Sequence, residues 1–183
     1  MVSAVKKNIE VEARSFISQS RLRQLGSFFD KKAKLEKKIT DETVYFSGPK
    51  DLRIRRDNHH TYLILKEGKI HDDHREEIEI VCPKEEFNNL ENLLQALGFK
   101  VEIRWQRQRR IYCWQGVKVF LDDTKGYGQI IELEKMASEK DKTKVHAQLV
   151  KLIESLGIKI TPKEEFNKKF AYYKKNWRKL LSF

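Results

Sequence analysis

The sequence predicts an α+β fold, an eight-stranded closed antiparallel β-barrel with helices packed outside it. Three observations lead to this prediction. A plan of short strand, helix and Leu-Gly occurs three times, further strands fill the chain between these units, and charged and apolar residues alternate along most strands. Because so many amphipathic strands would leave exposed edges, closure of the sheet into a barrel is the expected way to remove them.

The repeated plan has a Glu-x-Glu strand at each start. The three strands are expected at 8–12, 77–80 and 132–134, and the helices that follow them before Gly26, over 83–97 and over 141–156. Apolar residues recur at helical spacing in the second and third of these helices. A glycine directly after the last periodic leucine is typical of a C-terminal cap, so we expect the helices to end at Gly26, Gly98 and Gly157.

The remaining segments are predicted to be strands and tight turns. The expected strands lie at 51–57, 61–66, 75–81, 101–114, 117–122 and 129–134. Gln115-Gly116 closes a hairpin between two of them, since glycine supplies the backbone freedom that a tight turn needs. With the opening strand and a second strand that carries Tyr45-Phe46, these segments make about eight antiparallel strands.

The last segment is predicted to be a basic amphipathic helix at about 162–181. Thr161-Pro162 followed by Glu164 matches an N-cap, a proline in the first turn and a capping box. One face carries five large apolar side chains, Phe166, Phe170, Tyr173, Trp177 and Leu181. We expect this face to dock on the body with its lysines outward, and a basic helix of this kind can alternatively bind lipid or RNA.

Length and composition indicate one cytoplasmic domain over 1–183. The chain is 39% hydrophobic, which is enough to bury a core. It contains no apolar run long enough to span a membrane and no signal peptide, so no membrane partner is expected. Cys82 and Cys113 are too few for a disulfide framework and suit a reducing compartment.

The formal net charge of +11 is concentrated at the C-terminus. Residues 159–183 hold eight basic and two acidic side chains, so this tail carries +6 and the first 158 residues carry the remaining +5. The body therefore mixes both signs of charge. This distribution argues against a broad nucleic-acid surface, and no nucleic-acid partner is expected.

Like charges are doubled on single strand faces. Residues i and i+2 of a strand point to the same side. The doubled sets are Glu10, Glu12 with Arg14; Arg53 and Arg55; Glu77 and Glu79; Arg107 and Arg109; and Glu132 and Glu134. Cross-strand ion pairs on a solvated face, each contributing up to about 1 kcal/mol, would explain any single set. Doubled carboxylates, however, repel unless a cation lies between them, and doubled arginines favour an anion, so the whole pattern favours an enclosed ionic interior.

The ligand that suits this interior is a triphosphate delivered with a divalent metal. Carboxylates select hard cations such as Mg²⁺ or Mn²⁺, which also bind phosphate oxygens. Guanidinium forks bind phosphate in a bidentate manner. About six cationic side chains lie on these faces, which is more than a monophosphate requires. They are Arg14, Arg53, Arg55, Lys66, Arg107 and Arg109.

Seven short motifs then occur in the order found in the CYTH superfamily, which the chain resembles from about residue 8 to 181. They are Glu10-x-Glu12-x-Arg14, Leu52-Arg53-Ile54-Arg55, Lys66 at a strand end, Arg75-x-Glu77-x-Glu79, Arg107-x-Arg109-x-x-Tyr112, Leu121-Asp122 and Gly128-x-x-x-Glu132-x-Glu134. That superfamily comprises the triphosphate tunnel metalloenzymes: class IV adenylate cyclases, thiamine triphosphatases and inorganic triphosphatases. Its fold, an eight-stranded antiparallel tunnel, agrees with the barrel predicted above.

The resemblance also implies roles for individual residues. The metal ligands would be Glu10, Glu12, Asp122, Glu132 and Glu134. The phosphate ligands would be Arg14, Arg53, Arg55, Lys66, Arg107 and Arg109. Lys66, Arg109 and Asp122 would be catalytic, and Glu77 and Glu79 would lie on the tunnel wall.

Three positions depart from the family pattern. Arg14 and Arg107 stand where the family usually has lysine, which keeps the positive charge and replaces an ammonium by a guanidinium that stays protonated. Thr43 stands where the family has an Asp before Tyr45-Phe46. This last change affects contacts with the substrate's far end.

Three functions follow from these residues. The first is metal-dependent hydrolysis of a small-molecule triphosphate, either inorganic triphosphate, thiamine triphosphate or a nucleoside triphosphate, by a monomer or homodimer. The second is cyclisation of ATP to cyclic AMP and pyrophosphate in the same tunnel. The third is non-catalytic binding of polyphosphate or RNA, suggested by the basic tail and by Trp105 and Tyr112 near the arginines of 104–110. A binder of this last kind would not need metal.

Overall fold

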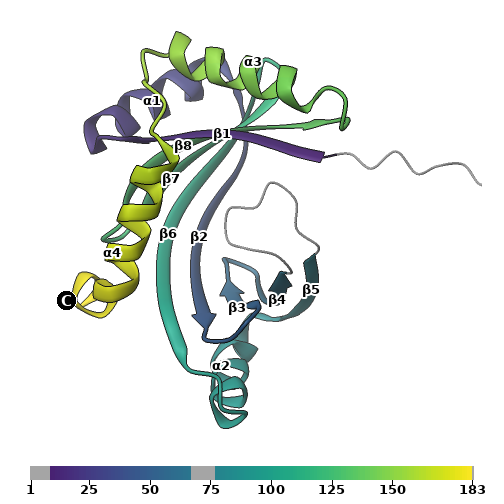
Figure 1. The fold of residues 1–183 in the computed structure, drawn as a ribbon, viewed down its shortest axis with the longest axis vertical. Coiled ribbons are helices and arrows are strands. Elements are labelled where there is room, and N and C mark those ends of the chain that lie inside the picture. Colours follow the sequence, from purple (N-terminus) through teal and green to yellow (C-terminus); the bar gives the residue numbers. More distant parts are fainter. Residues whose placement is uncertain (1–8, 67–76, 183) are drawn as a thin grey trace, which may run out of the picture. The chain divides into compact units, whose positions relative to one another are not determined.

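The computed structural model describes residues 9–66 and 77–182. The strands are β1 (Ile9–Ile17), β2 (Lys34–Phe46), β3 (Asp51–Arg56), β4 (His60–Lys66), β5 (Glu77–Pro83), β6 (Val101–Trp114), β7 (Val117–Thr124) and β8 (Gly128–Ala137) (Figure 1). The helices are α1 (Gln19–Lys32), the 3₁₀ helix η1 (Lys84–Glu86), α2 (Phe87–Ala96), α3 (Lys142–Ser155) and α4 (Lys163–Leu181). Arg75, which belongs to one of the quoted motifs, lies outside the described residues.

The strands form one eight-stranded sheet in the order β1-β8-β7-β6-β2-β3-β4-β5. The pairs β1–β8, β2–β3, β3–β4 and β4–β5 are antiparallel. The predicted α+β class and the eight antiparallel strands are thus confirmed. Within the described residues β1 and β5 stand at the two ends of the order, so closure into a barrel stays a prediction.

The described residues gather into two compact units, each drawn from three stretches of the chain. The first comes from 1–37, 110–121 and 129–162, and the second from 38–109, 122–128 and 163–183. Each unit has a hydrophobic core of its own. Among the described helices, none combines the length and apolar composition needed to cross a bilayer.

The first unit packs α1 and α3 against one face of the sheet. Val11 and Ala13 of β1 and Leu133 of β8 are buried in one cluster with Phe29 of α1 and Leu149 of α3. Because side chains alternate along a strand, the residues between these core positions point to the opposite face. This alternation places the acidic side chains of β1 and β8 away from the helices.

The second unit has helices on both faces of its strands. Val44, Ile54 and Phe87 belong to a cluster around α2, whereas Ile103 and Tyr173 belong to another around α4. Consecutive residues of β2 belong to different clusters. Tyr45 packs into the cluster around α4, whereas Val44 and Phe46 belong to the cluster around α2. The two helices therefore lie on opposite faces (Figure 1).

Helix α4 lies on the strand face of β6 that also carries Arg107 and Arg109. Ile103 and Trp105, which contact α4, alternate in phase with Arg107 and Arg109 on β6. One end of this ionic face is aromatic and apolar rather than charged. The helix covers that end because Trp105 there packs against Tyr173, with ring centroids 4.9 Å apart.

Helix α4 is anchored by two polar contacts as well as by its apolar face. Phe166, Tyr173, Trp177 and Leu181 are buried. The Tyr173 hydroxyl donates to the Arg104 carbonyl oxygen at 2.9 Å, and Trp177 Nε1 donates to the Glu102 carbonyl oxygen at 2.8 Å. These bonds fix the helix on β6.

Tyr173→Phe is expected to lower the free energy of unfolding by about 1–2 kcal/mol, because the Arg104 carbonyl would lose its side-chain donor inside a packed core. Urea unfolding measures this change. Tyr172→Phe is the matched control, since Tyr172 is adjacent and 61% exposed. Equal stabilities of the two variants would contradict the role given to the Tyr173 hydroxyl.

Two of the three predicted glycine caps are found, and the third is wrong. Gly98 and Gly157 follow α2 and α3 with φ of 94° and 72°. Gly26, in contrast, is buried in the middle of α1, which continues to Lys32. A Cβ at Gly26 would lie 2.9 Å from Arg110 Nη1, so this glycine serves a close approach rather than a helix end.

Candidate functional site

The first unit carries a row of ionic side chains on β1 and β8. In the antiparallel register Glu12 lies opposite Glu134, and Arg14 lies opposite Glu132. Glu10, two residues before Glu12, shares their face, which is opposite the core residues Val11 and Ala13. Arg14 Nη1 lies 3.5 Å from Glu12 Oε1. The sheet thus brings together five residues predicted for the site.

This row fits a hard divalent cation. Carboxylates placed directly opposite one another repel, and a cation between them removes that cost. Among the described residues, no three His, Cys, Asp or Glu side chains form a ready-made cage. Mg²⁺ does not require one, since it commonly takes one or two carboxylates and completes its shell with waters and substrate phosphates. The oxygen donors of Glu12 and Glu134 are therefore suitable ligands.

In the second unit, the arginines of β3 lie on one face of the sheet formed by β3, β4 and β5. Arg53 Nη2 lies 2.6 Å from Asp51 Oδ2, and its Nη1 donates to the Tyr45 hydroxyl at 3.0 Å. Arg55 Nη2 lies 3.3 Å from Glu79 Oε2. Each guanidinium is held by a carboxylate, and that of Arg55 lies 4.4 Å from the centre of the Tyr62 ring.

Lys66 and Glu77 are neighbours of this array by register. Lys66 pairs with Asp51 on one side and with Glu77 on the other. Arg53 and Glu79 each pair with Ile64, which alternates in phase with Lys66. Arg53, Lys66 and Glu79 therefore share one face of the sheet.

A second arginine array lies on β6 and β7. Arg109 grips Asp122 with two separate bonds, Nε to Oδ1 and Nη2 to Oδ2, each 2.6 Å long. Arg107 Nη1 donates to the same Oδ2 at 3.3 Å. The other edge of Arg107 contacts Asp41 of β2, with Nη2 donating to Oδ2 at 2.6 Å and Nε to the same atom at 3.2 Å.

These four side chains neutralise one another in a nearly enclosed position. The side chains of Asp41 and Asp122 are 3% and 7% exposed, and that of Arg107 is 18% exposed. Burial alone would lower the pKa of Arg107, but the nearby Asp122 and Asp41 carboxylates outweigh it and raise that pKa. Arg107 therefore stays charged at every physiological pH.

The predicted residues thus fall into two groups. Glu10, Glu12, Arg14, Glu132 and Glu134 belong to the first unit. Arg53, Arg55, Lys66, Glu77, Glu79, Arg107, Arg109 and Asp122 belong to the second. Asp122, predicted as a metal ligand, is found as the counter-ion of two arginines.

Asp41 is the site residue that the sequence analysis missed. Thr43 occupies the place of a family aspartate, and Asp41 lies two residues earlier and so on the same strand face as Thr43 and Tyr45. The alternation Asp41, Thr43, Tyr45 was the available signal. It went unused because the first half of β2, rich in lysine and glutamate, shows no apolar face.

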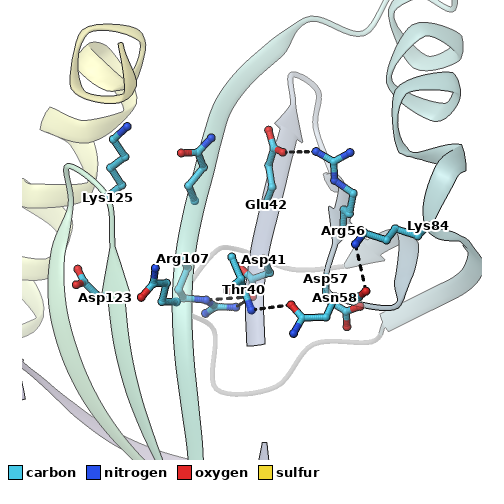
Figure 2. A pocket seen from close by; sticks show the side chains of 12 residues that line it. Thr40, Asp41, Glu42, Arg56, Asp57, Asn58, Lys84, Arg107, Asp123 and Lys125 are labelled. Carbon is cyan, nitrogen blue, oxygen red and sulfur yellow. Dashed lines mark hydrogen bonds and ion pairs between the residues drawn. The ribbon is translucent and has the colours of Figure 1, made fainter. Parts of the chain in front are cut away.

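The described cavities include one of about 800 Å³ in the second unit (Figure 2). Its lining is polar: Thr40, Asp41, Glu42, Arg56, Asp57, Asn58, Lys84, Gln106, Arg107, Gln108, Asp123 and Lys125. Arg107 is the member of the predicted set that lines it. Figure 2 shows Arg107 and Asp41 meeting across the space between β6 and β2.

Asp57, at one side of this cavity, has a perturbed carboxyl group. Burial raises the pKa of Asp57, but hydrogen bonds from the backbone N–H groups of His59 and His60, a hydrogen bond from the Tyr62 hydroxyl and the Arg55 charge outweigh burial, so the pKa is lowered. The Tyr62 hydroxyl donates to Asp57 Oδ2 at 2.9 Å. The charged form of this carboxyl thus fixes the β3–β4 turn.

Stability should fall in acid partly through this group. A carboxyl whose pKa is lower in the folded state contributes stability above its unfolded pKa and loses that stability as the pH falls through the lowered folded pKa. Asp57→Asn is therefore expected to show a smaller loss of thermal stability between pH 5 and about pH 3 than the parent. Parallel melting curves for parent and variant would contradict this account.

Comparison with known proteins identifies relatives over most of the chain. A family model described as CYTH domain matches residues 8–165. A protein of Methanocaldococcus jannaschii named "putative adenylate cyclase" is 30% identical over 166 residues, which cover 82% of this chain and 90% of that protein.

Solved structures share the fold. A Pyrococcus horikoshii protein aligns with a TM-score of 0.67 at 24% identity, covering 85% of this chain and 96% of that one. A Hippeastrum protein described as a "putative adenylyl cyclase" with a dominant triphosphatase activity aligns with a TM-score of 0.63 at 20% identity, covering 90% of this chain and 95% of that one.

Proposed function

The chain belongs to the CYTH domain family, and on that premise we propose that it hydrolyses a triphosphate with the help of Mg²⁺ or Mn²⁺. The observation that carries the proposal is the pairing of two complementary arrays in one small protein. One array is a carboxylate row on β1 and β8, and the other is a set of arginines on β3 and β6. Together they match a metal–polyphosphate complex, which neither array would match alone.

The arginine array supports the phosphate half of this proposal. Arg53, Arg55 and Arg109 present planar donors on strand faces that also carry Lys66 or Asp122. Because each guanidinium is already oriented by a carboxylate, little ordering would be needed when phosphate oxygens bind. In hydrolysis these cations would offset the negative charge that develops on the transferred phosphoryl group.

The carboxylate row supports the metal half. Glu10, Glu12, Glu132 and Glu134 are the residues that would hold the ion, with Arg14 as a neighbouring cation. Mg²⁺ or Mn²⁺ supplies Lewis-acid polarisation of phosphate oxygens and a water of lowered pKa.

We include closure of the sheet in the proposal. A closed tunnel would exclude bulk water from the arrays and so strengthen each charge–charge contact within them. The eight antiparallel strands and the membership in the CYTH family support this arrangement. The proposal needs both arrays to act on one substrate.

Cyclisation of ATP is the second candidate. The Methanocaldococcus jannaschii relative is named as an adenylate cyclase, and the same side chains could place a ribose hydroxyl against the α-phosphorus. The Hippeastrum protein, described with a dominant triphosphatase activity, favours hydrolysis. We therefore propose hydrolysis first.

Product analysis separates the two candidates. Purified protein is incubated with inorganic triphosphate, thiamine triphosphate or ATP in Mg²⁺ or Mn²⁺, and phosphate, pyrophosphate and cyclic AMP are quantified. Hydrolysis predicts orthophosphate release with no cyclic AMP. Cyclic AMP and pyrophosphate formed from ATP in equal amounts would replace hydrolysis by cyclisation.

A further inference from the structure

The two aspartates that hold the β6 arginines grip them differently. Asp122 gives one oxygen to each of the parallel N–H groups of Arg109, at 2.6 Å each. Asp41 gives only Oδ2 to both N–H groups of Arg107, at 2.6 Å and 3.2 Å. Asp41 therefore holds its arginine with the poorer geometry, since a guanidinium edge is best matched by two oxygens.

The second oxygen of Asp41 is unsatisfied. Oδ1 is buried and accepts no hydrogen bond from any described residue, and the Asp41 side chain is 3% exposed. An ionised oxygen buried without a donor is costly, and such a group in a folded protein calls for an explanation. The contact between Asp41 and Arg107 is thus a compromise that another anion could improve upon.

We propose that Asp41 is a displaceable counter-ion that holds the Nε–Nη2 edge of Arg107 and yields that edge to a phosphate group of the substrate. This inference rests on the proposed function. A phosphate group offers separate oxygens to both N–H groups of that edge, as Asp122 does for Arg109. Asp122, with both oxygens engaged, keeps Arg109 in place during the exchange.

Asp41 therefore sets the affinity of the site for phosphate. Its negative charge competes with the ligand for Arg107 and lowers the local positive potential. Removing this charge while keeping the side chain's shape should strengthen binding of the triphosphate. If Asp41 merely supported the fold, its substitution would change the triphosphate affinity in the opposite direction, because Arg107 would become disordered and binding would weaken.

Glu42 provides a matched control for this charge effect. It is adjacent to Asp41 on β2 and lines the same cavity, but its carboxylate pairs with Arg56 at 2.8 Å and with Arg104 instead of with Arg107. Glu42→Gln changes the net charge by the same amount as Asp41→Asn. A general electrostatic effect would therefore raise the triphosphate affinity of both variants equally. Release of Arg107 from its counter-ion would raise the affinity of Asp41→Asn specifically.

The test is calorimetric titration of inorganic triphosphate into the parent, Asp41→Asn and Glu42→Gln proteins in EDTA, where the arginines act without metal or turnover. We expect Asp41→Asn to lower the dissociation constant about fivefold, and Glu42→Gln to change it by less than about twofold. Equal tightening in both variants, or weaker binding by Asp41→Asn, would overturn the proposal. Absence of binding by both the parent and Asp41→Asn in EDTA would also overturn the counter-ion role, and it would leave the metal-dependent proposed function standing.

A measurement on the parent protein decides the case if Asp41→Asn does not fold. The side-chain Nε–H resonances of Arg107 and Arg109 are followed by NMR as inorganic triphosphate is added. Exchange of Asp41 for phosphate predicts a large shift of the Arg107 signal and a smaller shift for Arg109. An unmoved Arg107 signal at saturation would overturn the proposal.

Discussion

Glu132→Gln is expected to lower metal-dependent turnover by about 10²–10³-fold, because the substitution removes one anionic oxygen ligand from the β1–β8 row. Glutamine has nearly the same shape, and the core residues on either side, Ile131 and Leu133, point to the opposite face. The loss should therefore be chemical rather than structural. Phosphate release under saturating Mg²⁺ measures it, and thermal unfolding checks that the fold is kept.

Lys174→Ala is the control for this substitution. Lys174 lies on α4 and pairs with Glu102 at 2.6 Å, with both side chains more than a third exposed. A surface pair of this kind contributes at most about 1 kcal/mol, and the helix is anchored by Tyr173 and Trp177 instead. Equal activity of Glu132→Gln and Lys174→Ala would remove the role assigned to Glu132.

Arg109→Ala is expected to destabilise the fold by about 3 kcal/mol, because among the described residues it leaves the buried Asp122 carboxylate with the longer contact to Arg107 alone. The same variant should lose most of its phosphate affinity. Urea unfolding measures the first effect, and titration with inorganic triphosphate measures the second. Adding Asp122→Ala to Arg109→Ala should restore part of the stability without restoring phosphate binding.

The neighbouring Arg110 gives the matched control. It points to the opposite face of β6, and its side chain is 49% exposed. Its Nη1 lies 3.8 Å from Asp30 Oδ2. Arg110→Ala should cost less than about 1 kcal/mol. If the two alanine variants were equally stable, the buried fork between Arg109 and Asp122 would not be the stabilising contact that its geometry indicates.

Strand alternation was the part of the sequence that predicted structure best. It placed Glu10 with Glu12, Glu132 with Glu134 and Arg53 with Arg55 on shared strand faces. The register of β1 with β8 and of β3 with β4 agrees with these groupings. Local turn chemistry was equally informative at Gly98 and Gly157, where a left-handed backbone follows a helix. These signals are local, so the sequence carries them directly.

Long-range contacts were not predictable in the same way. Gly26 resembles a helix cap in sequence, yet it is needed where Arg110, far away in the chain, approaches α1. Asp41 was missed because its importance comes from Arg107, 66 residues later. The aromatic end of the ionic face was also missed, because Trp105 meets Tyr173 only once α4 has docked.

The central claim is that the carboxylate row and the arginine arrays act on one metal–triphosphate substrate. Phosphate release from inorganic triphosphate, measured while Mg²⁺ or Mn²⁺ is titrated against EDTA, tests it most directly. The account predicts release that rises with free metal and stops on chelation. Two results together would contradict it. Inorganic triphosphate would bind equally well with and without metal, and neither it nor any other triphosphate would be cleaved.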